Sequence, residues 1–288
     1  MDWNRRSFLA AGLASGAVTK PVWAKPQDAA LWEVQRDRSK VYLFGDGGPL
    51  RKPWRSARIE AALHDSAVLW KEVPAGGLGA ALEAFDAGID PFEPLSSWLS
   101  WKDRNRVAAA AAAVGVGALG LEYSKPWLAA QFLQGSFYAK FGFEQANSAD
   151  SILPAIAKGA GKPIRAEFAE MAEVIEFASS LSRPAQIQSL LSIVDVIEAG
   201  PDSETRRASA WAVGDDSLET RNIGRWMKIY PDFYREVVVA RNRRWPARIR
   251  TMLMGGGTSF VLVGGDHLLG PDSIQAQLAL AGMTARRL

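Results

Sequence analysis

The sequence predicts an α/β fold in which strands from both ends of the chain build one central sheet and a large helical middle insertion packs on it. Three observations lead to this prediction. Short apolar runs that stop at glycine or proline occur between residues 31 and 73 and again between 258 and 263. Most of the chain between these regions has apolar residues at helical spacing. Strands that alternate with helices are typical of an α/β sheet.

The N-terminal part is predicted to contain a hairpin, a helix and a third strand. Residues 31–34 and 41–44 are apolar runs joined by a polar stretch, and the second run ends at Gly45. Residues 57–63 have helical spacing. Residues 67–73 form the third predicted strand, because a proline and two glycines soon follow and stop the apolar run.

The middle of the chain is predicted to be mostly helical. Helical patterns run from about residue 78 to 160 and are broken by three prolines. One strand is predicted over residues 164–168, and a further helix follows it. Residues 211–254 again have helical spacing, but Pro246 should kink or interrupt this helix, because proline removes a backbone hydrogen bond.

The C-terminal part completes the predicted sheet. Residues 258–263 form a strand, a helix follows near 272–280, and a last strand ends the chain. No internal repeat or linker divides the sequence. We therefore expect residues 25–288 to fold as one α/β domain.

Composition excludes several classes of site. The chain has 288 residues, of which 48% are apolar and 23% are charged, as in ordinary globular proteins. The net charge is only +3 and no basic cluster is evident, so we expect no nucleic-acid partner. The absence of cysteine excludes disulfides, thiolate metal sites and a cysteine nucleophile. With His64 and His267 as the only histidines, a three-histidine zinc site is excluded.

The first 24 residues are predicted to be a twin-arginine signal peptide. Arg5 and Arg6 precede Ser-Phe-Leu and a short apolar stretch, and Lys20 comes shortly before a small residue, Ala24, at the predicted cleavage site. The mature protein is thus expected in the periplasm or otherwise exported. No other stretch of about 20 uncharged apolar residues occurs, so no membrane span is expected after cleavage.

Polar residues follow three of the predicted strands. Asp46 lies in a glycine-rich turn after the second strand, Glu72 lies at the end of the third, and the late strand runs into Gly264-Gly265-Asp266-His267. Ligands of open α/β sheets bind outside the carboxyl ends of the strands. We therefore expect these residues to line a common crevice.

Several blocks of the sequence resemble the TraB/GumN family, whose relatives include the TIKI metalloproteases. The most specific are residues 241–243 and the closing Phe260–Gly270 block, and the resemblance extends from about residue 31 to residue 288. It implies an α/β fold of the TraB/TIKI type. The other blocks lie in the family's order along the chain: residues 31–34 with 41–45, 124–128, 161–163 followed by Glu167, and 211–215.

The family resemblance implies a metal-dependent hydrolytic centre made of two Gly-x-x-His motifs and a glutamate. The second motif corresponds to Gly264–His267 and the glutamate to Glu72, while Arg241 and Asn242 correspond to polar helix positions near the site. The first motif is broken, because Gly48 stands where its histidine belongs. His64 lies one predicted helix later and is expected on a solvated face.

Two functions of different classes follow. In the first, His267, Glu72 and Asp46 hold a divalent metal (Mn, Co or Zn) in a peptidase-like hydrolase. Glu72 or Glu167 would then handle protons and Arg241 or Asn242 would stabilise an oxyanion, unless these two only tie their helix to the sheet. In the second, no metal is bound, and the crevice holds a peptide, an envelope-polysaccharide fragment or a protein partner without cleaving it.

Overall fold

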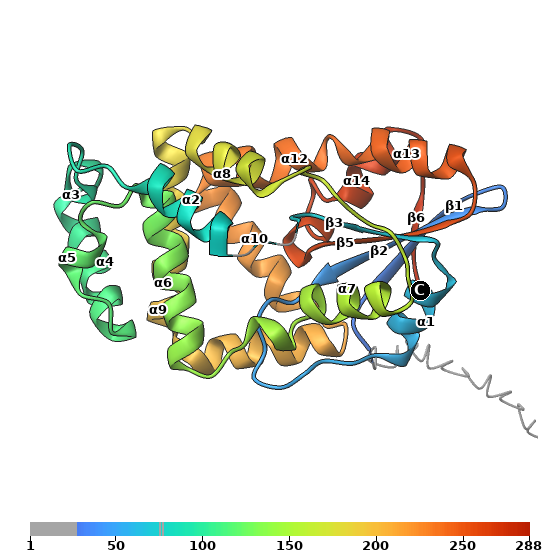
Figure 1. The fold of residues 1–288 in the computed structure, drawn as a ribbon, viewed down its shortest axis with the longest axis horizontal. Helices are drawn as coiled ribbons and strands as arrows, with labels where there is room; N and C mark the ends of the chain where they lie inside the picture. Colours follow the sequence, from blue (N-terminus) through green and yellow to red (C-terminus); the bar gives the residue numbers. More distant parts are fainter. Residues whose placement is uncertain (1–27, 75, 77) are drawn as a thin grey trace, which may run out of the picture.

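The structure, a computed structural model, describes residues 28–74, 76 and 78–288. The predicted signal peptide therefore lies outside the described residues. Within them, the predicted fold class is confirmed: a six-stranded sheet is built mainly from the two ends of the chain, and the middle is helical (Figure 1).

The sheet is parallel in its larger part and antiparallel at one edge. The first four strands in sheet order are parallel, whereas the fifth is antiparallel to its two neighbours. The predicted hairpin is confirmed, because β1 pairs with β2. In sheet order the strands are β4 (Ile164–Ala166), β3 (Val68–Lys71), β5 (Thr258–Gly264), β2 (Ser39–Asp46), β1 (Leu31–Arg36) and β6 (Ala285–Arg287).

Helices cover both faces of the sheet. Alternate residues of a strand point to opposite faces, so Phe44 packs with α1 (Ala57–Asp65) and α7 (Ala149–Gly159) on one side. Leu43, the preceding residue, packs with α13 (Trp245–Gly255) and α14 (Ile274–Leu280) on the other. Both faces of the sheet are therefore shielded from water by helices, which explains why the central strands are continuous apolar runs.

The rest of the middle region forms its own helical core. α4 (Trp101–Val114), α6 (Pro126–Lys140) and α9 (Arg183–Ala212) share a cluster of buried apolar side chains. Figure 1 places them beyond the carboxyl end of the parallel strands, toward which the arrowhead of β2 points. We expected the helical insertion to pack on the sheet, and α7 does so. The other helices lie beside the strand ends, because α1, α7, α13 and α14 already cover the faces.

Long predicted helices are divided at glycine and proline. Gly200 has φ +79° and bends α9 just before Pro201. Pro246 lies in the first turn of α13, so the predicted helix over 211–254 is interrupted there, as expected. The remaining segments are α2 (Leu78–Gly88), α3 (Leu95–Trp98), α5 (Ala118–Leu121), the 3₁₀ turn η1 (Gln145–Asn147), α8 (Met171–Ser180), α10 (Ser217–Ile229), α11 (Pro231–Phe233), the π-helical η2 (Tyr234–Val239), α12 (Ala240–Asn242) and the 3₁₀ turn η3 (Gly265–Leu268).

A bilayer-spanning helix needs about 20 residues that are mostly apolar. No helix in the described part of the chain meets both requirements.

The aromatic packing under β2 should carry much of the stability. Phe44 is fully buried and stacks on Trp54, with ring centres 5.3 Å apart. Phe44→Ala should lower the free energy of unfolding by about 3–5 kcal/mol, since it leaves a cavity in a closed core. Phe92→Ala is the matched control, because Phe92 is 94% exposed. Urea titration measures both, and equal losses would contradict this assignment of the core.

Candidate functional site

Glu72 follows β3 directly and belongs to a buried polar cluster. Its Oε1 accepts a hydrogen bond from Nη1 of Arg241 at 2.6 Å, and its Oε2 accepts one from the backbone N–H of Gly264 at 2.8 Å. Gly264 ends β5, the strand that pairs with β3. The parallel pairing therefore brings Glu72 beside the predicted Gly264–His267 motif. This agrees with the expectation that residues at the carboxyl ends of neighbouring strands lie together.

Arg241 and Asn242 come from α12, directly after the π-helical η2, and both are buried. The amide nitrogen of Asn242 donates to the backbone carbonyls of His267 and Asp272, at 3.3 and 2.8 Å. Its oxygen therefore faces Nδ1 of His267, at 2.7 Å. Because an amide oxygen only accepts, Nδ1 carries a proton, and Nε2 is the nitrogen that faces Glu72 at 3.5 Å.

A second carboxylate, Glu167, neutralises the other side of Arg241. Nη2 and Nε of Arg241 both donate to Glu167, whose side chain is 1% exposed. The guanidinium also lies over the rings of Phe168 and Phe177, 5.3 and 5.8 Å from their centres. Arg241 is thus a buried cation between two carboxylates and two aromatic faces, and it ties α12 to the sheet.

Burial and charge act in opposite directions on this cluster. Burial alone would raise the pKa of Glu72, but the charges of Arg241 and His267 outweigh it and hold the pKa well below its usual value. Burial alone would lower the pKa of His267, but the carboxylates of Asp266 and Glu72 raise it above its usual value. The cluster therefore favours the ionised form of Glu72 and raises the pKa of His267.

Asp46 lies elsewhere at the same edge of the sheet. Its two carboxylate oxygens accept hydrogen bonds from the backbone N–H groups of Gly48 and Asp150, at 2.9 and 3.1 Å. Burial, together with the nearby charge of Asp150, raises the pKa of Asp46 to about 6. Asp46 is thus engaged by its own turn and by the first turn of α7, rather than by Glu72 or His267.

The arrangement does not fit a divalent metal. Among the residues that the structure describes, no group of three or more histidine, aspartate or glutamate side chains is placed to hold one. Glu72 and His267 do meet, but Nη1 of Arg241 contacts both, at 2.6 and 3.3 Å. Nη1 of Arg241 therefore makes the contacts with Glu72 and His267 that a bound metal ion would have to make.

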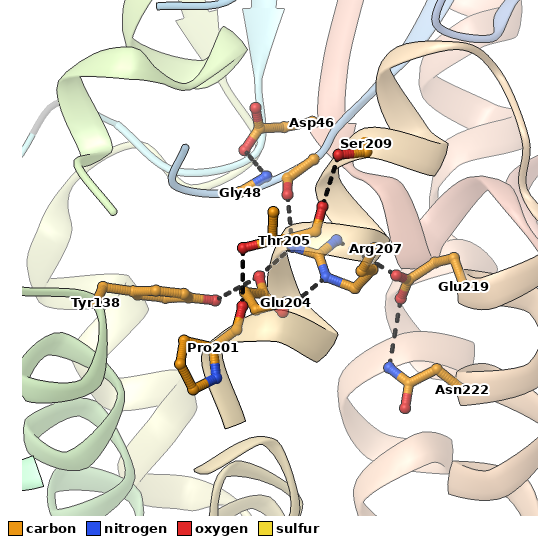
Figure 2. Close-up of polar contacts among 11 residues, drawn as sticks. Asp46, Gly48, Tyr138, Pro201, Glu204, Thr205, Arg207, Ser209, Glu219 and Asn222 are labelled. Atoms are coloured by element: carbon orange, nitrogen blue, oxygen red, sulfur yellow. Dashed lines mark hydrogen bonds and ion pairs between the residues drawn. The ribbon is translucent and has the colours of Figure 1, made fainter. Parts of the chain in front are cut away.

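Gly48, where the family's first histidine would stand, faces an arginine. Gly48 has φ +79°, and a Cβ added there would lie 3.5 Å from Nη2 of Arg207. Arg207 donates to the carbonyl oxygen of Gly47 at 2.7 Å, and its guanidinium pairs with Glu204 and, at 3.4 Å, with Glu219 (Figure 2). Burial raises the pKa of Glu219, and Asp266 adds to that rise against the effect of Arg207.

Sequence reasoning missed this second cluster of Arg207, Glu204 and Glu219. A local signal existed, because Glu204 and Arg207 are three residues apart in the helix after Gly200, so they share one helical face. Their contact with the turn after β2 is tertiary and has no local signature. His64 was correctly placed on a solvated face, since it is exposed in the last turn of α1.

A crevice of about 390 Å³ adjoins both clusters. Glu72 and Arg241 contribute to one part of its wall, and Glu204, Arg207 and Glu219 contribute to another. Much of the remaining lining is apolar or aromatic. The aromatic residues among it are Trp127, Tyr138, Phe168, Phe177, Trp226 and Phe233.

The raised pKa of Asp46 predicts a specific pH dependence. A carboxyl whose pKa rises on folding, from 3.8 to about 6, makes the folded state bind its proton more tightly. Its contribution to the free energy of unfolding therefore falls as pH rises from 4 to 6, by about 3 kcal/mol in total. Asp46→Asn should remove this slope in urea titrations at several pH values. Asp37→Asn, at an exposed turn, should keep it, and an unchanged slope in Asp46→Asn would refute the assignment.

The ion pair between Arg207 and Glu204 gives a second prediction. Arg207→Met leaves the 5% exposed carboxylate of Glu204 without its main partner, so stability should fall by about 3–5 kcal/mol. Adding Glu204→Gln should recover part of the loss, because the unpaired charge is removed. Arg206→Met is the matched control, because Arg206 is exposed on the same helix. Urea unfolding checks all three, and a double variant no more stable than Arg207→Met would contradict the pairing.

The comparisons with known proteins agree with the resemblance noted in the sequence. The profile of the TraB/PrgY/gumN family matches residues 30–287, which is nearly the whole chain. No curated protein and no solved structure gave a significant match. The chain belongs to the TraB/PrgY/gumN family.

Proposed function

We propose that this protein is an exported binding protein that keeps the family's crevice but does not catalyse hydrolysis. The observation that carries the proposal is the position of Arg241. Its Nη1 contacts Oε1 of Glu72 at 2.6 Å and Nε2 of His267 at 3.3 Å, so the two family residues that remain are bound to a side chain. A buried arginine cannot release its proton and cannot be displaced without leaving two carboxylates unpaired.

The broken first motif supports the same proposal. Gly48 provides no donor, and Asp46, the remaining candidate ligand, already accepts two backbone hydrogen bonds. A catalytic metal usually needs three protein ligands and an open position for water. The roles given to Glu72, Arg241 and Asn242 in hydrolysis are therefore replaced by a role in holding the wall of the crevice.

The crevice itself is suited to binding. Its volume of about 390 Å³ lies in the range of small-molecule sites, and its lining combines aromatic surfaces with a few polar groups. Glu72 remains 19% exposed, so one charged group can contact a ligand. A peptide, a polysaccharide fragment or a segment of a partner protein remains the class of occupant proposed. The proposed export rests on the twin-arginine pattern of the first 24 residues.

Metal analysis tests the loss of catalysis. Protein purified from an exporting host without chelator should contain no stoichiometric Mn, Co or Zn by inductively coupled plasma mass spectrometry. Adding each ion should leave the melting temperature within about 1 °C, because a ligand that does not bind the folded state does not stabilise it. A panel of peptide and ester substrates should show no metal-dependent turnover.

If the wild-type protein does contain metal, the His267→Ala and Glu72→Ala variants show whether these two residues bind it. Stoichiometric metal in the wild type that is lost in both variants would establish a two-residue metal site and refute the proposal. Metal that persists in both variants would be bound elsewhere, and the crevice would still lack a catalytic ion. Asp65→Ala is a matched control, because it removes a carboxylate at the end of α1 outside the site.

A further inference from the structure

A groove between α9 and α10 carries an excess of arginines. It has a volume of about 380 Å³ and is lined by four arginines but only two carboxylates. The arginines come from both helices, and Arg221 and Arg225 lie four residues apart on one face of α10. The charged lining residues are Arg206, Arg207, Arg221, Arg225, Asp195 and Glu204.

The two carboxylates of this groove are already neutralised. Asp195 pairs with Arg106 at 2.7 Å and with Arg225 at 2.8 Å, and it also accepts a hydrogen bond from the hydroxyl of Tyr230 at 2.6 Å. Glu204 is bound by Arg207. Asp195 and Glu204 are therefore already paired and do not neutralise the other arginines of the groove.

Arg206 and Arg221 supply the excess. Both are exposed, and neither has an ion pair with a carboxylate in the described ranges. A guanidinium presents a planar fork of donors that matches carboxylate, sulfonate and phosphate oxygens. Two such forks, one on each side of a groove, are the chemistry of an anion site.

The groove adjoins the crevice of the proposed function. Both cavities are lined by the same six residues, of which Val196 and Trp226 are apolar: Ser192, Val196, Glu204, Arg207, Asn222 and Trp226. On the crevice side the lining becomes apolar, with Ile193, Phe177 and Phe233. A ligand that occupies both cavities would therefore have an aromatic compartment at one end and a cationic one at the other.

We propose that the two cavities together bind an amphipathic anion, whose apolar part lies in the crevice and whose carboxylate, sulfonate or phosphate lies at Arg206 and Arg221. This inference rests on the proposed function, because it requires the crevice to bind a ligand. To the proposed function it adds the chemical class of the ligand, an amphipathic anion. A neutral molecule with the same apolar part would leave both guanidinium groups in water and would bind less tightly.

Two fluorescent probes that differ by one group test this proposal. 1-Anilinonaphthalene-8-sulfonate carries an aromatic body and a sulfonate, whereas N-phenyl-1-naphthylamine has the same ring system without the charge. The sulfonated probe should bind the full-length mature protein about fivefold to tenfold more tightly at low salt, as expected for two partly exposed ion pairs. Raising the salt concentration should weaken only the sulfonated probe.

Arginine variants locate the anion site. Arg206→Gln with Arg221→Gln should remove the advantage of the sulfonated probe and leave the neutral probe unchanged. Both side chains are exposed, and neither pairs with a carboxylate of the described residues, so the variant should fold normally. Lys52→Gln with Lys158→Gln is the matched control, because it removes two exposed charges away from the groove. Ala178→Trp, which fills the crevice, should weaken both probes.

The outcomes separate the two proposals. If neither probe binds, or if Ala178→Trp affects neither, the crevice is not a binding site and the proposed function fails with this inference. If both probes bind equally and the arginine variant changes nothing, the anion site is refuted while the binding crevice stands. Equal loss of the sulfonated probe in the lysine control would show a general charge effect and would also overturn the inference.

Discussion

The buried guanidinium of Arg241 is the interaction on which the site depends. Removing a charge from water is costly unless it is paired, so the fold must supply partners from every side. Those partners are Glu72 after β3, Glu167 after β4, and the aromatic faces of Phe168 and Phe177. One side chain therefore connects the ends of two strands to the helix that follows η2, and it fixes the edge of the sheet at which ligands of this fold class bind.

The same interaction changes what the neighbouring residues can do. Glu72 is also held by the backbone of Gly264, and His267 is oriented by Asn242. In this state each group has a fixed partner, which is the basis of the proposal that the cluster supports the shape of the crevice. The groove beside this crevice differs, because Arg206 and Arg221 are exposed there and form no ion pair with a carboxylate in the described part of the chain.

Much of the fold followed from local patterns. The hairpin of β1 and β2 was predictable because two apolar runs flank a polar turn, and the interruption at Pro246 followed from the chemistry of proline. The meeting of Glu72 and His267 was predictable because both follow parallel strands. The roles of these residues could not be predicted in the same way, because they depend on which residues, distant in the sequence, contact them in the folded chain.

Asp46 and Arg207 illustrate that difference. Asp46 is the last residue of β2 and Glu72 directly follows β3, but one carboxylate oxygen of Asp46 accepts a hydrogen bond from the first turn of α7. Arg207 comes from a helix far along the chain, and no periodicity shows that it contacts the turn after β2. The helical core also lies beyond the strand ends because α1, α7, α13 and α14 occupy the faces, which is a property of the whole packing arrangement.

The backbone at Gly48 has a consequence for how this site can change over evolutionary time. Its left-handed conformation disfavours a side chain, and an added Cβ would already lie 3.5 Å from Nη2 of Arg207. A mutation to histidine would meet both obstacles together, and removing Arg207 first would expose Glu204 as an unpaired buried charge. Each single step is therefore unfavourable, so placing a histidine at position 48 would require more than one change at the same time.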